Sequence, residues 1–218
     1  MMTAFLQSVV ALLFIAVGSV TTHANDGGQY IGKLVVEPLD NGRDLKLVKP
    51  FAYRDPGGQL WRVPAETVVN GASIPQAAWT FIGGPFSGRY RNASVIHDYF
   101  CERKDRPWNQ VHKVFYDAME TSGVQPWRRN VMYAAVYQFG PRWEKGIRSV
   151  RVCKRRDGNE CAEWATAKRE ELIVKQPKFD PQQFKKMQSL LKAKDMSPQE
   201  IERLVDKELR SSTLDKFD

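Results

Sequence analysis

Three helical patterns follow one another between residues 92 and 140, and they constrain the fold more than any other feature of the sequence. We expect one helix over residues 92–102, a second from Pro107 to Gly123 and a third from Pro126 to Gly140. Proline is favoured in the first turn of a helix and glycine just after its end. The last two helices carry stripes at helical spacing, Val111, Phe115, Ala118 and Ser122 on one, and Met132, Ala135, Val136 and Phe139 on the other. The chain must cover these stripes, so we expect its core to form around the helices.

The residues before these helices have the pattern of strands. Between Tyr30 and Pro64, runs rich in Val, Leu and aromatic residues alternate with turn signals at residues 40–42 and 55–58. This pattern predicts a three-stranded meander, which needs something packed on one face. A capping box at Ser73 predicts a short helix up to residue 82 that covers part of it. The expected fold class is α+β, with a small N-terminal antiparallel β-meander packed on a helical core and a charged helical C-terminal extension.

The chain divides into three parts by composition. Residues 1–24 lack charge, contain an apolar stretch and end in small residues, so they are expected to be a signal peptide cleaved before Asn25; an uncleaved anchor is the alternative. Residues 25–165 are expected to form one α+β domain. Residues 166–218 are charged and contain two helical patterns, 180–194 and 197–211, which fit either a docked helical hairpin or a partly disordered tail.

Export sets expectations for the cysteines and for the compartment. A secreted or periplasmic protein matures in an oxidising environment, where three cysteines give one disulfide and one remaining thiol. Cys153 and Cys161 flank a tight-turn signal at Asp157-Gly158, so we expect them to pair across a hairpin. Cys101 is then the remaining thiol.

The net charge of +8 favours anionic partners. For an exported protein these are anionic membrane or cell-wall surfaces. No nucleic-acid-binding motif is found, so nucleic acid is not an expected partner. Basic residues cluster in two places, Arg128 and Arg129 beside Trp127, and Arg148, Arg151, Lys154, Arg155 and Arg156 further along. A membrane-facing surface and a solvated face both remain open for them.

The chemistry of the domain centres on His97 and Asp98. Histidine changes protonation near neutral pH, and an adjacent carboxylate can hold a cation. His97 is either a general base or metal ligand, or a hydrogen-bonded histidine of the core. Asp98 either supports a cation or pairs with a nearby arginine.

A zinc site is a second interpretation of the same helix. His97 and Cys101 are four residues apart and share a helical face, and His112 lies on the next predicted helix. Two histidines and a thiolate suit zinc, with Asp98 or a water as fourth ligand. A buried thiol beside ordinary histidines is the alternative. Ser73 could serve as a nucleophile, but its capping role explains it better.

Several short strings stand out between residues 30 and 140, namely Val69-Asn70-Gly71-Ala72-Ser73-Ile74-Pro75, Gly84-Pro85, Gly88-Arg89-Tyr90, Ala93 to Tyr99 and Phe115 to Met119. With these strings, the segment from about residue 30 to 140 resembles a bacterial and phage family, domain of unknown function 1353. The family pattern has Asp where this chain has Asn70, Tyr where it has Cys101, and Asp where it has His112. Asn70 is a candidate binding residue, through its amide, beside His97.

The His-Asp helix is also similar to that of secreted calcium-dependent phospholipases. That likeness implies His97 as the base for a water and Asp98 as a calcium ligand. It also implies a loop lined by Gly83, Gly84 and Gly88. His112 stands where such enzymes have the orienting carboxylate.

Three functional hypotheses follow from these patterns. The first is an exported hydrolase that uses His97 and Asp98, with an ester or lipid as substrate. The second is a non-catalytic cell-envelope protein that binds a partner through its basic surface and its C-terminal helices. The third is a structural zinc module.

Overall fold

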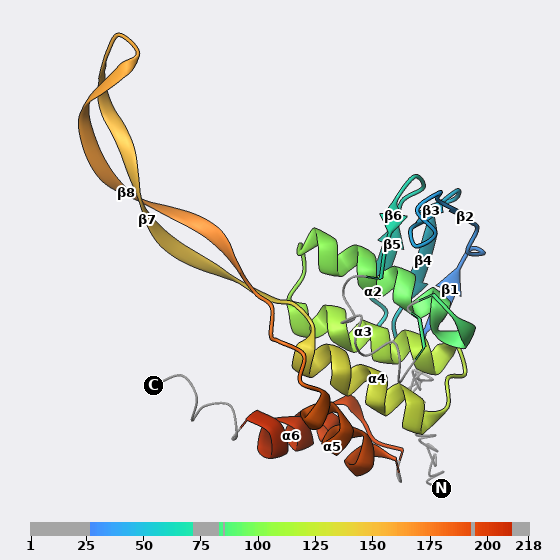
Figure 1. The fold of residues 1–218 in the computed structure, drawn as a ribbon. Coiled ribbons are helices and arrows are strands. Elements are labelled where there is room, and N and C mark those ends of the chain that lie inside the picture. The colour runs from blue at the N-terminus through green and yellow to red at the C-terminus, as the bar shows by residue number, and fades with distance from the viewer. Residues whose placement is uncertain (1–26, 72–82, 85, 193–194, 211–218) are drawn as a thin grey trace, which may run out of the picture.

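The computed structural model describes residues 27–71, 83–84, 86–192 and 195–210. The predicted signal peptide and the predicted capping-box helix at residues 73–82 lie outside these ranges. None of the helices in the described ranges is long and apolar enough to cross a membrane. The expected α+β class is confirmed (Figure 1).

The three helices predicted between residues 92 and 140 are present. They are α2 (Arg91–Arg103), α3 (Trp108–Thr121) and α4 (Pro126–Phe139). Helix α2 ends where Lys104 adopts a left-handed conformation and its amide bonds back to the carbonyl of Phe100. Short connections join the helices, which pack against one another in chain order in Figure 1.

The N-terminal strands form two small antiparallel sheets. One sheet has the order β1-β4-β5 and the other β2-β3-β6. The strands are β1 (Gln29–Ile31), β2 (Val36–Pro38), β3 (Leu45–Leu47), β4 (Phe51–Arg54), β5 (Leu60–Val63) and β6 (Val68–Val69).

The prediction of a single three-stranded meander was therefore wrong in detail. The first expected strand is divided after Ile31, where Gly32 has φ +84° and turns the chain. The second is divided between β3 and β4, where Pro50 has no amide hydrogen to donate to a neighbouring strand.

Aromatic side chains attach the first sheet to the helices. The Tyr30 hydroxyl lies 2.8 Å from the carbonyl oxygen of Ala118 on α3, to which it donates. The Trp61 ring meets the edge of Phe100 on α2 at a centroid distance of 5.0 Å, and the Arg106 guanidinium lies 4.2 Å from the centre of that indole. Because these contacts join residues far apart in sequence, they fix the sheet on α2 and α3.

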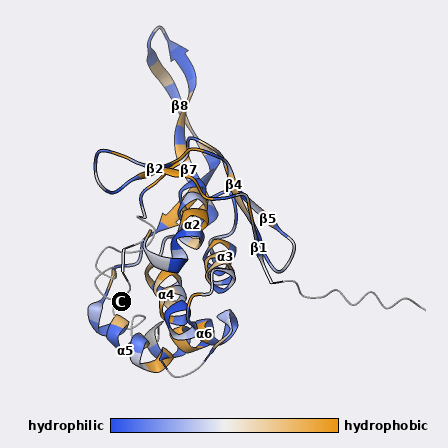
Figure 2. Ribbon diagram, turned by 90° about the vertical axis from the view of Figure 1, so that its right-hand side faces the viewer, coloured by the Kyte–Doolittle hydropathy of each residue, from blue (hydrophilic) through white to orange (hydrophobic). Residues whose placement is uncertain are grey.

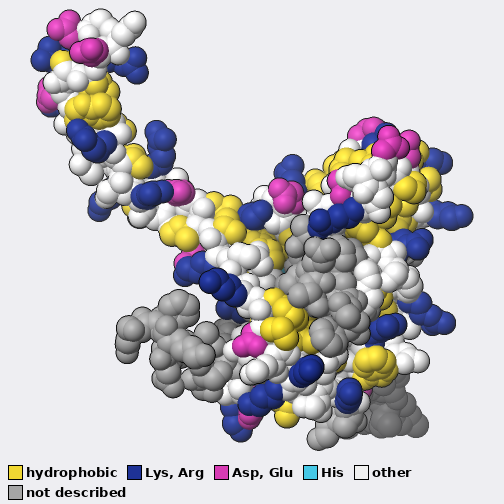
Figure 3. All heavy atoms as spheres, viewed as in Figure 1, with side chains coloured by type: hydrophobic (Ala, Val, Ile, Leu, Met, Phe, Trp, Pro, Cys, Tyr) yellow, Lys and Arg dark blue, Asp and Glu magenta, His cyan; other side chains and the backbone are white. Residues whose placement is uncertain are grey.

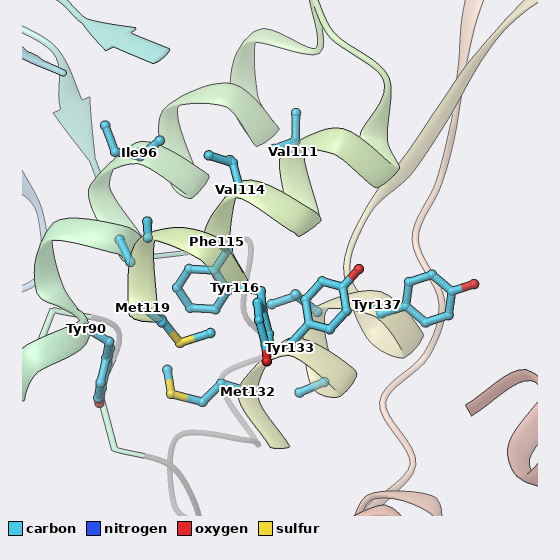
Figure 4. Packing of buried hydrophobic residues seen from close by; sticks show 14 of the residues in the cluster. Tyr90, Ile96, Val111, Val114, Phe115, Tyr116, Met119, Met132, Tyr133 and Tyr137 are labelled. Atoms are coloured by element: carbon cyan, nitrogen blue, oxygen red, sulfur yellow. The ribbon is translucent and has the colours of Figure 1, made fainter. Parts of the chain in front are cut away.

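The main core lies between α2, α3 and α4. Figure 4 shows Phe115 and Met119 of α3 and Met132 of α4 pointing into the space that these helices share. These three side chains are fully buried, as is Ile96 on α2. Helix α4 is buried on nearly all sides, because α3 covers one face and the C-terminal helices cover the other.

A long hairpin leaves the body after α4. Strands β7 (Arg142–Asp157) and β8 (Glu160–Lys175) each have sixteen residues and pair only with each other among the described strands. The ribbon projects from the body in Figure 1 and alternates hydrophilic and hydrophobic segments in Figure 2. The boundary predicted after residue 165 falls inside β8, so the first ten residues of the expected tail belong to this strand.

The predicted disulfide is present near the tip of this hairpin. Cys153 and Cys161 are bonded, with their Cα atoms 5.6 Å apart. The turn between the strands contains Gly158 at φ +60°, and a register shift around Arg155 brings the two cysteines together. Cys101 is free of disulfide bonding and buried.

The two predicted C-terminal helices are present and docked. They are α5 (Pro181–Leu191) and α6 (Pro198–Val205), the latter continued by a π-turn, η2 (Asp206–Arg210). Asp180 caps α5, and Ser197 with Glu200 forms a capping box on α6. Their buried side chains, Phe184, Met187, Leu191, Ile201 and Val205, join the main core. Between the two interpretations of the tail, the described part fits the docked helical hairpin.

Candidate metal centre

Helices α2 and α3 bring two histidines and a cysteine together. His97 and Cys101 are one turn apart on α2, and His112 faces them from α3. The Nε2 atom of His97 lies 2.9 Å from Nδ1 of His112 and 3.4 Å from Sγ of Cys101. These three atoms all lie within 4.8 Å of one another. The three-residue set expected from the sequence is therefore assembled.

Aromatic rings and the C-terminal end of α4, at Gly140, enclose these three side chains. The ring of His97 stacks on Phe115 at 4.7 Å, and Trp108 meets His112 at 5.5 Å. Both histidines have no exposed surface, and Cys101 is 4 % exposed. A Cβ at Gly140 would stand 3.0 Å from Nε2 of His112 and 2.3 Å from a carbonyl oxygen of α4, so only glycine fits there.

Burial holds both histidines neutral. Loss of hydration lowers the pKa of His97 well below 6.5, and the neighbouring His112 lowers it further. Burial also lowers the pKa of His112 to about 3, although its hydrogen bond to the carbonyl of Pro141 acts in the opposite direction.

The tautomer of His112 follows from its partner. Nε2 of His112 lies 3.1 Å from the Pro141 carbonyl oxygen, which only accepts, so the proton of the neutral ring belongs on Nε2. Nδ1 then presents its lone pair toward His97 and Cys101. A ligating histidine commonly donates its other N–H to a backbone carbonyl in this way.

Asp98 faces away from this set and holds a loop. Its Oδ2 accepts the backbone amides of Asn70 at 2.8 Å and Gly71 at 3.0 Å. Arg43 donates from Nε to the carbonyl oxygen of Asn70 at 3.0 Å and secures the same turn. Asp98 is not among the described side chains that converge as metal ligands, and its predicted roles in catalysis and cation binding stay predictions.

A pocket of about 230 Å³ lies beside the centre. Its wall is formed by Val68, Asn70, Asp98, Cys101, Glu102, Lys104, Pro141, Val174 and Gln176. Asn70 thus lies near the His97 helix, as predicted, although its contacts with Asp98 and Arg43 use its backbone. Cys101 connects the pocket to the buried histidines.

The other candidate binding residues are Ser73, Gly84 of the predicted glycine-lined loop, and Arg128 and Arg129 of the basic cluster. Of these, the described residues Gly84, Arg128 and Arg129 do not line this pocket. Ser73 is outside the described ranges. The carbonyl oxygen of Gly84 accepts from the hydroxyls of Ser87 and Tyr90, 2.9 and 2.7 Å away, at the turn that leads into α2. Arg128 lines a separate pocket of about 360 Å³ that also includes Arg89.

Arg129 has a structural role in the described chain. It is buried, and its Nη2 lies 3.2 Å from a carboxylate oxygen of Glu120 and 2.8 Å from one of Asp195. Its guanidinium also lies 4.7 Å from the centre of the Tyr116 ring. These contacts tie α3 and α4 to the C-terminal helices and leave little of Arg129 for an external ligand.

The sequence analysis did not predict two parts of the site. Pro141 supplies the carbonyl oxygen for His112, and Val174 with Gln176 brings the base of β8 to the pocket wall. Gly140 was predicted as the end of the helix, but the carbonyl acceptor that follows it at Pro141 cannot be recognised from residue type, because every residue has a backbone carbonyl. The contribution of β8 required the hairpin, which the predicted domain boundary had cut.

Comparisons with known proteins find relatives without an assigned activity. The "Uncharacterized protein y4jT" of Sinorhizobium fredii is 50% identical over 99 residues, covering 45% of this chain and 30% of that protein. The "Uncharacterized protein y4iH" of the same organism is 37% identical over 150 residues, covering 63% of each. The chain thus spans less than two thirds of the length of either relative. No solved structure matches.

The matched relatives leave the likeness to secreted phospholipases a prediction, because neither carries a described activity. A family model does match, and it covers strands β3 to β6, helices α2 and α3 and most of α4. The resemblance stated from the signature residues is confirmed: residues 45–136 match the family described as "Protein of unknown function (DUF1353)".

Proposed function

We propose that this domain binds a transition-metal ion, with zinc preferred, through His97, Cys101 and His112. The observation that carries the proposal is the convergence of Nε2, Sγ and Nδ1 from three side chains on one point. Zinc bonds of about 2.0–2.3 Å in tetrahedral geometry place ligand atoms roughly 3.3–3.6 Å apart. The two separations from Nε2 of His97, 2.9 and 3.4 Å, lie within a few tenths of an ångström of these values. The third, between Sγ of Cys101 and Nδ1 of His112, lies within 4.8 Å and has to close to the same range when the ion binds.

The same geometry argues against a catalytic relay. In a relay, one ring nitrogen of the histidine contacts the nucleophile and the other contacts the orienting group. Here the same Nε2 of His97 contacts both Cys101 and His112. The arrangement suits three ligands around an ion better than a base between two partners.

The donor set selects among metals. A thiolate and two imidazoles suit zinc, whereas calcium takes six to eight oxygen ligands. The carboxylate of Asp98, the calcium ligand implied by the phospholipase likeness, instead receives two backbone amides. Zinc therefore fits the centre better than calcium does.

We propose hydrolysis as the reaction class, because of the pocket beside the centre. This proposal depends on the metal binding proposed above. The pocket borders Cys101, so a fourth ligand position would face a space large enough for water and a small substrate group. Zinc lowers the pKa of a bound water to about 7 and makes it a nucleophile. An ester or lipid remains our proposed substrate class.

We also propose that the protein works outside the cytoplasm. The disulfide between Cys153 and Cys161 is compatible with an oxidising compartment, either the periplasm or the medium. The apolar faces of α5 and α6 are covered by α4, so a protein partner at the C-terminal helices would contact their outer, polar faces.

Metal analysis tests the proposal directly. The chain from Asn25, which holds every described residue, is purified without added metal, and its zinc content is measured by mass spectrometry. We expect close to one zinc per chain, and less than a tenth of that in Cys101→Ser and His112→Gln. Val95→Ala, a core truncation on the same helix, serves as the control that loses stability but keeps the zinc.

Two results would overturn the proposal. Absence of zinc before and after equilibration with excess zinc would remove the metal centre. Calcium binding that disappears in Asp98→Ala and persists in Cys101→Ser would transfer the site to the phospholipase-like arrangement. Cobalt substitution adds a readout independent of activity, because a thiolate ligand gives a charge-transfer band that Cys101→Ser should abolish.

A further inference from the structure

The projecting hairpin exposes apolar surface that the rest of the described chain does not cover. Ile147 is 70% exposed and Trp164 is 53% exposed, and both lie beyond the base of the ribbon. An isolated two-stranded ribbon is marginally stable and gains from packing on another surface. The hairpin is therefore the part of the described structure that most needs an external partner.

The register divides the ribbon into two distinct faces. Residues directly opposite one another in an antiparallel pair share a face. One face, here called the Trp164 face, consists of Trp143, Lys145, Ile147, Ser149, Arg151, Cys153, Trp164, Thr166, Lys168, Glu170, Leu172 and Val174. The opposite face contains Glu144, Arg148, Val150, Arg169, Glu171 and Lys175 among its members.

The opposite face pairs part of its charge within the ribbon. Lys175 pairs with Glu144 at 3.1 Å, and Arg148 pairs with Glu171 at 3.4 Å. Its exposed Ile173 packs over the space that Gly146 leaves across the ribbon. Two of its four cations, Arg148 and Lys175, therefore have carboxylate partners within the ribbon, and a third, Arg142, donates to carbonyl oxygens of α4.

The Trp164 face combines apolar groups with cations that form no ion pair in the described part of the chain. Lys145, Arg151 and Lys168 belong to it, against the single carboxylate of Glu170. The Arg151 guanidinium lies 4.8 Å from the centre of the Trp164 ring. Figure 3 shows hydrophobic side chains along the ribbon interspersed with Lys and Arg.

We propose that the Trp164 face docks on an anionic lipid bilayer. Tryptophan concentrates at the boundary between headgroups and acyl chains, and each Lys or Arg near an anionic leaflet adds attraction. Apolar and cationic side chains are interspersed along this face. The apolar groups can therefore enter the headgroup–acyl boundary while the cations stay among the headgroups. Because two-stranded ribbons twist strongly, the contact centres on the middle of the ribbon, at Ile147, Arg151, Trp164 and Lys168.

A second copy of the chain fits the Trp164 face less well than an anionic bilayer does, because of its charge. Two Trp164 faces brought together would oppose like charges at Arg151 and Lys168, and charged residues along both strands disfavour edge-to-edge pairing. Docking needs no metal at His97 and His112, so this proposal and the metal proposal fail independently.

Vesicle sedimentation tests the proposal. The chain from Asn25 is mixed with vesicles of phosphatidylcholine containing 30% phosphatidylglycerol, and with phosphatidylcholine alone, at low salt. We expect binding to the anionic vesicles only. Arg151→Gln with Lys168→Gln should reduce the partition coefficient roughly 10- to 30-fold, and Trp164→Ala on the order of tenfold.

A matched double variant separates the two faces. Arg148→Gln with Arg169→Gln removes the same charge from the opposite face and should change binding by less than about threefold. An equal loss in both double variants would show attraction by bulk charge and overturn the assignment of the face. Retention on polyglutamate without binding to anionic vesicles would assign the face to an acidic protein, and no binding to either would also overturn the proposal.

Discussion

Acidification should destabilise the metal-free protein well before its carboxylates titrate. The chain from Asn25 contains two histidines, His97 and His112, because the third histidine of the sequence precedes it. Both are neutral in the fold, since burial lowers their pKa values, that of His112 to about 3. The unfolded chain, with a histidine pKa of about 6.5, binds protons that the folded chain does not.

The sign and size of the effect follow from this difference. Where the unfolded state binds more protons, the free energy of unfolding falls as the pH falls. For His112 the loss begins near pH 6.5, reaches about 1.4 kcal/mol between pH 7.5 and 5.5, and continues to about pH 3. His97 adds to the loss in the same direction.

Urea unfolding in the presence of a chelator measures this loss at pH 7.5, 6.5 and 5.5. His112→Gln should flatten the pH dependence, leaving the contribution of His97. Burial raises the pKa of Asp117, which acts in the opposite direction, and an Asp117→Asn background removes that contribution. A free energy of unfolding that is constant or rises between pH 7.5 and 5.5 would refute the neutral, buried histidine pair.

Asp98→Ala should lower the free energy of unfolding by about 2 kcal/mol, because two loop amides lose their acceptor; Asp98→Asn, which keeps one acceptor oxygen, should lose less in the same urea titration. Tyr133→Phe should cost about 1–2 kcal/mol, since its hydroxyl donates to Glu202 on α6, and hydrogen exchange should then rise first in α6; unchanged exchange would contradict that docking contact. Replacing both Cys153 and Cys161 by Ser removes the bond between the two strands, so trypsin should cleave the hairpin faster. The thermal midpoint of the helical core should stay the same. A lower midpoint would show that the hairpin and the core unfold together.

The helices were predictable because particular residue types, proline at the start and glycine at the end, mark where they begin and stop. Pro126 lies at the first turn of α4 and Gly123 follows α3 with φ +66°, so sequence and structure agree within a few residues. The disulfide was predictable for the same reason, because a tight turn between two cysteines fixes their distance. Residues close together in the sequence therefore determine both the helix ends and the disulfide.

The hairpin and the paired sheets were not predictable in the same way. Strands β7 and β8 carry many charged residues and both of their faces are exposed, so the alternation of apolar and polar residues that marks a half-buried strand is weak. The division of the N-terminal strands into two sheets depends on which edges pair across the chain. Such pairing is a tertiary property that turn residues alone do not determine.

The His-Asp pair shows where the sequence stops informing the site. Neighbouring residues on a helix lie about 100° apart around its axis, so His97 and Asp98 face different neighbours. One direction was predictable, because Cys101 shares the face of His97 at a spacing of four and the next helix carries His112. The other was not, because Asp98 receives backbone amides from a loop 27 and 28 residues earlier, and backbone amides are common to nearly every residue. The carboxylate beside the histidine therefore stabilises the loop that forms the pocket wall. The metal proposal rests on the adjoining side of the same helix, where His97 and Cys101 lie.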